Sequence, residues 1–264
     1  MTKKRVWCKN MHGCILAIAL AIFLFQTIFL FSGIFPGSKT LVANIIIASM
    51  SLLAFISVTI LYFNFPKNFP YEKKAKLFLT ISMFLFFIGD FIWLLDENFL
   101  NITVFLVELP NFFWNAAYIM LAISLIFFIK IEFRERKSLY ILLGISAMIS
   151  AVGLYLTSGN YFSNGTLILS ELIEHLYPVY NLFLFMMVLY LLYPLIKSGN
   201  KLFLGWIFLG AGIITRIIYD TILVLMPGSK LSQVGNPIDL IYVSLYLFVI
   251  LNNLMKSRLR FKND

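Results

Sequence analysis

Residues 77–96 read LFLTISMFLFFIGDFIWLLD, and Asp90 is the one charged side chain in this stretch before Asp96 at its end. An apolar helix of about 20 residues is long enough to cross the hydrocarbon core of a bilayer. Further stretches of the same character are found at 14–34, 42–64, 103–129, 138–157, 168–195, 202–226 and 235–255. The sequence therefore predicts an all-α polytopic membrane protein, a single integral membrane domain over residues 1–264 with about eight transmembrane helices.

The composition of the whole chain excludes an ordinary soluble domain. Hydrophobic residues make up 61% of the sequence and charged residues 12%, and the mean hydropathy is +0.92. Soluble globular domains have about 25% charged residues and a correspondingly smaller apolar share. The connections between the predicted spans are short, so we expect no separate soluble domain.

The basic residues predict the orientation of the spans. Of the 21 lysines and arginines, 18 lie at the chain ends or in alternate connections that would share one side of the membrane. The positive-inside rule places that side, and therefore both termini, in the cytoplasm of a cell-membrane protein. The net charge of +9 reflects these cytoplasmic basic residues, which would be attracted to the anionic headgroups of membrane lipid. We therefore expect membrane lipid and no nucleic acid as a partner.

The opposite connections contain two glycosylation acceptor patterns. Asn101 and Asn164 each begin an Asn-X-Thr sequence, in the connections 97–102 and 158–167 that we expect outside the cytoplasm. Such patterns are short and often occur by chance, but their location agrees with the charge-based orientation.

Similar sequences in the two halves of the chain indicate an internal repeat. Lys76-Leu-Phe-Leu opens the third span and Lys201-Leu-Phe-Leu opens the seventh. Asp90 would then correspond to Asp220, and the Asn111, Trp114, Tyr118 spacing to Asp239, Tyr242 and Tyr246. Repeats 14–129 and 138–255 with four helices each would be parallel and related by an axis along the membrane normal.

Polar side chains within the spans fall in one layer in the predicted outer half of the membrane. Buried charges are costly in lipid, so we expect these side chains to face the interior of the bundle, around one outward-opening cavity. The spacing of Glu171, Glu174 and His175 superficially resembles that of metal ligands. No second His or Cys lies near them, so we expect no metal and no cofactor. The predicted ligand-binding residues are Asp90, Asn111, Trp114, Tyr118, Glu174, His175, Asn181, Arg216, Asp220, Asp239 and Tyr242.

Arg216 is the one basic residue of this layer, against three aspartates. It could pair with Asp220, four positions later on the same helix, or with Asp90 or Asp239 on a neighbouring helix. In either arrangement the carboxylates outnumber the arginine. A cation, a bound proton or a cationic ligand could supply the missing positive charge.

Three short motifs resemble a known family. They are GDFIW at 89–93, YPVYN at 177–181 and DLIYVSLY at 239–246. Together they resemble the seven-to-eight-helix membrane sensory modules of bacteria and archaea, which are fused elsewhere to diguanylate cyclases or histidine kinases. The resemblance implies a stand-alone sensor-like protein that binds a small amphiphilic or cationic ligand and signals through a cytoplasmic protein partner.

A weaker resemblance points to an enzyme. Gly89-Asp90, the sequence 115–118 and Gly210-Ala211 ahead of Asp220 are similar to the eight-helix lysoplasmalogenase family. That resemblance implies an intramembrane lipid hydrolase in which Asp90 and Asp220 are the catalytic pair. Asn115 occupies a position where the family pattern has His, which removes a group able to transfer protons near neutral pH. A transporter of small molecules or ions is the third alternative.

Overall fold

The structure is a computed structural model of the chain. It describes residues 3–32, 38–65, 69–100, 108–132, 140–141, 144–145, 147–148, 162–163, 166–167, 169–198, 203–225 and 235–260.

Long helices dominate the described residues. Their bounds are α1 (Lys3–Ser32), α2 (Lys39–Phe63), α3 (Pro70–Leu95), α4 (Glu108–Glu132), α6 (Leu169–Ser198), α7 (Phe203–Leu225) and α8 (Ile238–Arg260). Six of them, all but α6, contain described segments long and apolar enough to cross a membrane, and α6 contains the shorter apolar segment Val179–Leu192. The predicted helical architecture, with several helices long and apolar enough to cross a membrane, is therefore confirmed. The predicted fifth span, 138–157, lies largely outside the described residues, as do Asn101 and Asn164.

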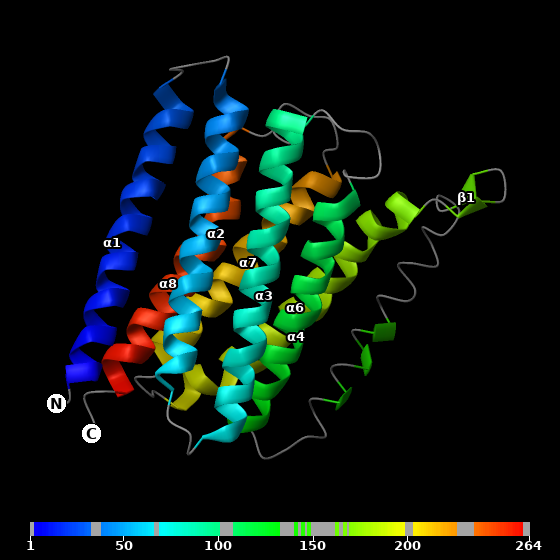
Figure 1. Cartoon of the computed structure of the whole chain (residues 1–264). Helices are drawn as coiled ribbons and strands as arrows, with labels where there is room; N and C mark the ends of the chain where they lie inside the picture. Colours follow the sequence, from blue (N-terminus) through cyan, green and yellow to red (C-terminus); the bar gives the residue numbers. More distant parts are fainter. Residues whose placement is uncertain are drawn as a thin grey trace.

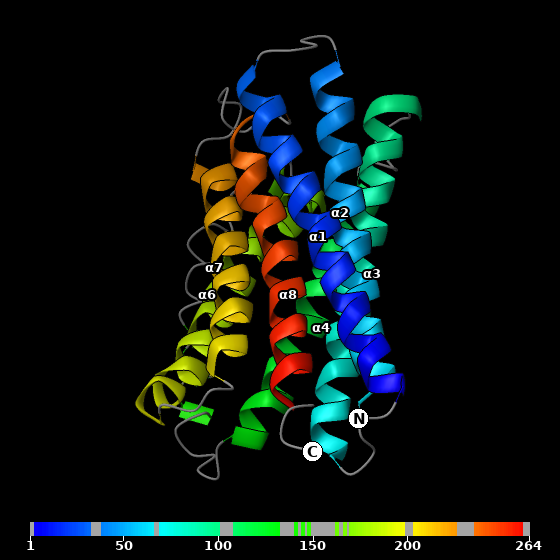
Figure 2. The same cartoon turned by 90° about the vertical axis from the view of Figure 1, so that its left-hand side faces the viewer.

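The helices form one bundle in which sequence neighbours pack side by side (Figure 1). Additional contacts join α8 to α1 and α2, and join α4 to α6. Figure 2 shows α8 between α1 and α7. The helix α1 begins, and α8 ends, at the same end of the bundle (Figure 1). This arrangement brings the last helix of the chain against helices from its first half.

Burial distinguishes the centre of the bundle from its surface. In the apolar segment of α8 that could cross a membrane, 67% of the residues are buried inside the protein, compared with 28% in the corresponding segment of α1. The outward face of α1 exposes Leu24, Phe25, Ile28 and Phe31, each more than half accessible. A contiguous apolar surface of this kind is unusual on a soluble monomer but suits contact with lipid chains.

Small side chains allow close packing of α3 on α4 and of α7 on α8. The Ser82 hydroxyl of α3 donates to the Ala117 carbonyl of α4 at 2.9 Å. On α7, a Cβ atom added at Gly212 would lie 3.1 Å from the Leu245 carbonyl oxygen of α8. Small residues and hydroxyl groups at helix contacts are typical of membrane bundles, in which lipid provides no hydrophobic drive for helix association.

Several boundaries differ from the sequence prediction: α1 already begins at Lys3, and the third helix differs at both ends. The third helix begins at Pro70, before the predicted span, because proline is well suited to the first helical position. At its other end it continues into a π-helical turn, η2 (Asp96–Leu100), which covers part of the predicted connection 97–102. Within the predicted connection 158–167, β1 (Phe162–Ser163) pairs antiparallel with β2 (Thr166–Leu167).

Candidate functional site

Asp90 lies in the centre of the bundle and accepts three hydrogen bonds. Its side chain is buried, and the donors are the Trp114 indole N–H at 3.0 Å and the hydroxyls of Tyr242 at 2.5 Å and Tyr246 at 2.6 Å. These donors come from α4 and α8. These donors replace the hydrogen bonds that the buried carboxylate would otherwise make to water.

The residue before this aspartate permits the contact with α4. A Cβ atom added at Gly89 would lie 2.5 Å from the Trp114 Nε1 atom, which is too close for any side chain. Glycine is therefore required for the Trp114 ring to reach Asp90. This is a packing requirement that helix propensity alone would oppose.

Arg216 pairs with the aspartate of its own helix. Its Nε atom lies 3.1 Å from Asp220 Oδ1, and the Nε–H donates to the Tyr118 hydroxyl at 2.6 Å. The Tyr118 hydroxyl in turn donates to Asp220 Oδ2. Of the pairings open to Arg216 in the sequence, the structure has the one four positions along α7. Tyr118 ties this pair to α4.

Four aromatic rings surround the guanidinium group. The Arg216 Cζ atom lies 4.1 Å from the centre of the Tyr242 ring, 5.4 Å from Phe86, 5.5 Å from Tyr219 and 5.6 Å from Tyr118. Each such contact is worth roughly 0.5 to 2 kcal/mol, and more where water is excluded. The rings lie on α3, α4, α7 and α8, so the cation holds four helices together.

Tyr242 joins the two aspartate sites into one network. Its hydroxyl donates to Asp90, while its ring packs against the Arg216 guanidinium group. Asp90, Arg216 and Asp220 are all at least nine-tenths buried. The structure therefore brings these three predicted residues together, with Trp114, Tyr118 and Tyr242 as their partners.

A second tyrosine group extends the network to α6. The Tyr118 ring stacks on Tyr180 and meets Tyr177 edge to face, each with ring centres 5.7 Å apart. The Tyr177 hydroxyl donates to Asn111 Oδ1 at 2.8 Å. Asn181, one position after Tyr180, lies beside Asp220. Two predicted amide residues, Asn111 and Asn181, are thus adjacent to the charged network.

Several buried polar atoms near the network have no hydrogen-bond partner in the structure. They include Arg216 Nη1, Asn115 Oδ1 and Asn181 Oδ1. The Asn115 side-chain N–H donates to the Asn111 backbone carbonyl at 2.7 Å, and the Asn115 Oδ1 atom is the one without a donor. These three atoms, one donor and two acceptors, are buried, and such atoms usually require water or a ligand.

Asp239 has a different local role. Its carboxylate Oδ2 accepts the Gly235 backbone N–H at 2.7 Å, just before α8 begins. Gly235 has φ +88°, which favours glycine. The charge of Glu97 lies near Asp239, and Glu97 accepts a hydrogen bond from Asn44 at 2.5 Å. Within the described part of the chain, the hydrogen bonds of Asp239 join it to the start of α8 rather than to Arg216.

The remaining predicted site residues are Glu174 and His175. Both lie on α6, but their side chains are outside the part of the structure that is described. Among the described residues, no group of three or more His, Cys, Asp or Glu side chains could hold a metal ion.

Several residues that contact this network were absent from the predicted site. They are Ser51, Phe86, Asn115, Tyr177, Tyr180, Tyr219 and Tyr246. Tyr246 carried a usable signal, since it aligns with Tyr118 in the proposed repeat and lies one turn after Tyr242 on α8. Ser51, which lies beside Asp90, and Phe86 carried none, because a serine or a phenylalanine in an apolar span is usually a packing residue.

The chain matches no protein-family model, and comparisons with curated proteins and with solved structures found no match.

Proposed function

We propose that this chain is a sensor-like membrane protein that binds a small amphiphilic ligand at Arg216. The observation that carries this proposal is the guanidinium group, which is enclosed by four aromatic rings while its Nη1 atom has no acceptor. An aromatic enclosure fixes the cation in place before a ligand arrives, which lowers the entropy cost of binding. An oxygen atom of a ligand would complete the hydrogen bonding.

The contacts favour an oxygen-bearing amphiphile over a cation. Asp90 already accepts three hydrogen bonds, and Asp220 is occupied by Arg216 and Tyr118. Around Arg216 the atoms still without partners include its own Nη1 donor and the amide oxygens of Asn115 and Asn181, while the carboxylate oxygen Asp239 Oδ1 lies at the start of α8. A hydroxyl or carbonyl group next to an apolar chain would match them, because it can accept from Arg216 and donate to an amide oxygen.

Signalling in this proposal depends on the pairing of Arg216 with Tyr118. A ligand oxygen that draws the guanidinium group away would weaken the link between α7 and α4. A ligand can shift such an equilibrium only by its different affinity for the two arrangements. We infer that a cytoplasmic protein partner would detect the shift at the basic ends of the helices.

Two parallel repeats, 14–129 and 138–255, are part of this proposal, and the contacts of the two aspartates support them. Asp90 accepts from Tyr246, and Asp220 accepts from Tyr118. Each aspartate is thus bonded to the tyrosine of the other half. An exchange of this kind is what a two-fold axis between the halves would generate.

The helices that precede the two aspartates in the sequence also occupy corresponding positions. Ser51 of α2 lies beside Asp90, and Asn181 of α6 lies beside Asp220. Asn181 comes about 130 positions after Ser51, and Asp220 comes about 130 positions after Asp90. In addition, α2 packs on α8 as α6 packs on α4.

The close approach between neighbouring helices also recurs. Ser82 meets the carbonyl of Ala117, and Gly212 meets the carbonyl of Leu245, again about 130 positions later. The same offset pairs Phe86 with Arg216. The first repeat would therefore have a phenylalanine at the position where the second repeat has its buried arginine.

We also propose a cell-membrane location with both termini in the cytoplasm. The distribution of the basic residues supports this orientation. So does the location of the start of α1 and the end of α8 at one end of the bundle (Figure 1). In the same view α4 ends low and α6 begins high, which supports one more crossing between them and eight in total.

A lysoplasmalogenase-type hydrolase is the second candidate, and one observation favours it. Asp90 and Asp220 are both buried and are joined through Tyr242 and Arg216. Two carboxylates with different surroundings can divide the roles of general acid and general base. In this case the same network would act on the vinyl ether of a lysolipid.

A vinyl-ether lysolipid separates the two candidates, because it carries both a free hydroxyl and the cleavable bond. Purified protein should bind it, with an increase in melting temperature that Arg216→Gln abolishes, and should release no aldehyde. Aldehyde release by the wild type that disappears in folded Asp90→Asn and Asp220→Asn would instead establish the hydrolase. Neither binding nor turnover of the lysolipid would contradict both.

A further inference from the structure

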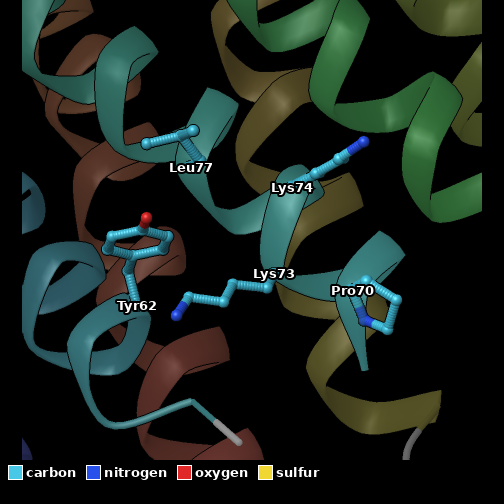
Figure 3. Close-up of a pocket in the computed structure, with 5 residues that line it drawn as sticks. All are labelled: Tyr62, Pro70, Lys73, Lys74 and Leu77. Atoms are coloured by element: carbon cyan, nitrogen blue, oxygen red, sulfur yellow. The ribbon is translucent and has the colours of Figure 1, made fainter. Parts of the chain in front are cut away.

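A cavity of about 310 Å³ opens between the end of α2 and the first turns of α3 (Figure 3). It lies at the end of the bundle where α1 begins and α8 ends (Figure 1), far along α3 from Asp90. Its lining consists of Tyr62, Pro70, Lys73, Lys74 and Leu77. The cavity therefore belongs to a part of the protein that the proposed ligand site does not use.

Positive charge borders this cavity. Figure 3 shows Lys73 extending from α3 toward Tyr62, and the Lys73 Nζ atom lies 5.5 Å from the centre of that ring. Lys74 extends from the next position in the opposite direction. The first two turns of α3 carry Lys73, Lys74 and Lys76 against Glu72 alone. The net charge around the cavity favours an anion.

Exposed aromatic residues come directly after two of the residues that line the cavity. Phe63 follows Tyr62 and is 73% exposed, and Tyr71 follows Pro70 and is 59% exposed. Aromatic side chains are enriched at the headgroup level of membranes, where one end contacts acyl chains and the other contacts water. A molecule in the cavity would therefore meet both a basic group and an apolar surface.

We propose that this cavity binds the headgroup of an anionic phospholipid. The phosphate group would accept hydrogen bonds from the Lys73 ammonium group, and the acyl chains would lie along Phe63 and Tyr71. Basic pockets between membrane helices have the charge and the depth that lipid phosphates require. A free phosphate ion would gain the charge contact but not the apolar one.

Lys73→Gln tests the charge, and Lys130→Gln is its matched control. Lys130 also lies over an aromatic ring, with its Nζ atom 5.7 Å from the centre of Phe127, and it is exposed but does not line the cavity. Native mass spectrometry in a maltoside detergent would count bound phosphatidylglycerol and phosphatidylcholine. We expect preferential binding of one phosphatidylglycerol, weakened about fivefold by Lys73→Gln and unchanged by Lys130→Gln.

Leu77→Trp tests the cavity itself while keeping every lysine. The larger ring should fill the space and abolish the bound phosphatidylglycerol, and an unchanged melting temperature without lipid would confirm that the variant is folded. Equal binding of both lipids, equal loss in the two lysine variants, or full binding by folded Leu77→Trp would each overturn the proposal. Displacement of the lipid by millimolar inorganic phosphate would assign the site to free phosphate instead.

Discussion

The Tyr246 hydroxyl of α8 donates to the Asp90 carboxylate of α3 at 2.6 Å, although 156 positions separate the two residues. Tyr118 of α4 makes the corresponding bond to Asp220 of α7. The carboxylates in the interior of the bundle are thus stabilised by hydroxyl groups from helices that are distant in sequence. Loss of either hydroxyl should have a measurable effect on stability.

Tyr246→Phe should lower stability by about 1.5 to 3 kcal/mol, the usual contribution of a hydrogen bond to a charged group. The ring remains, so packing is preserved and only the donor is lost. Tyr140→Phe is the control, because Tyr140 is exposed. Thermal unfolding in detergent measures both variants. Equal melting temperatures for the two would show that the bond to Asp90 does not contribute.

Gly89→Ala should be strongly destabilising, by about 1 to 3 kcal/mol, because the added methyl group would overlap the Trp114 ring. Gly13→Ala is the matched control, since a Cβ atom at Gly13 would meet nothing within 4 Å. Helix propensity predicts that this control is neutral or stabilising by up to about 1 kcal/mol. Replacement of Trp114 with leucine should partly rescue Gly89→Ala. A rescue that fails would contradict the packing explanation.

Arg216→Met should cost about 3 to 5 kcal/mol, because it leaves the buried Asp220 carboxylate without its cation. Asp239→Asn should cost less, since its amide oxygen can still accept the Gly235 N–H. The double variant Arg216→Met, Asp220→Leu should recover much of the loss. Unfolding temperatures of the four proteins would decide the matter, and a double variant no better than Arg216→Met would refute the pairing argument.

Accessibility labelling tests the topology. In a background with Cys8 and Cys14 replaced by serine, a cysteine at Gly159 should react with a membrane-impermeant maleimide added to intact cells. A cysteine at Lys137 should react only after the membrane is opened. Both expectations follow from the location of the basic residues on one side. Labelling of the cysteine at position 137 in intact cells would contradict the predicted orientation.

The sequence by itself was sufficient to predict the long apolar helices, because a bilayer-spanning segment is a local property of about 20 residues. It also identified Asp90, Arg216 and Asp220 as buried groups, since each is a charge within such a segment. The alternation of basic connections allowed an orientation to be predicted in the same local way.

Only the tertiary structure decided how these charges are satisfied. The sequence left open whether Arg216 pairs along its own helix or across to another, and it suggested a shortage of positive charge around the aspartates. In the structure, Trp114, Tyr242 and Tyr246 supply the donors to Asp90. The rotation and depth of each helix determine these contacts. Both depend on packing across the whole bundle, which periodicity within one helix does not specify.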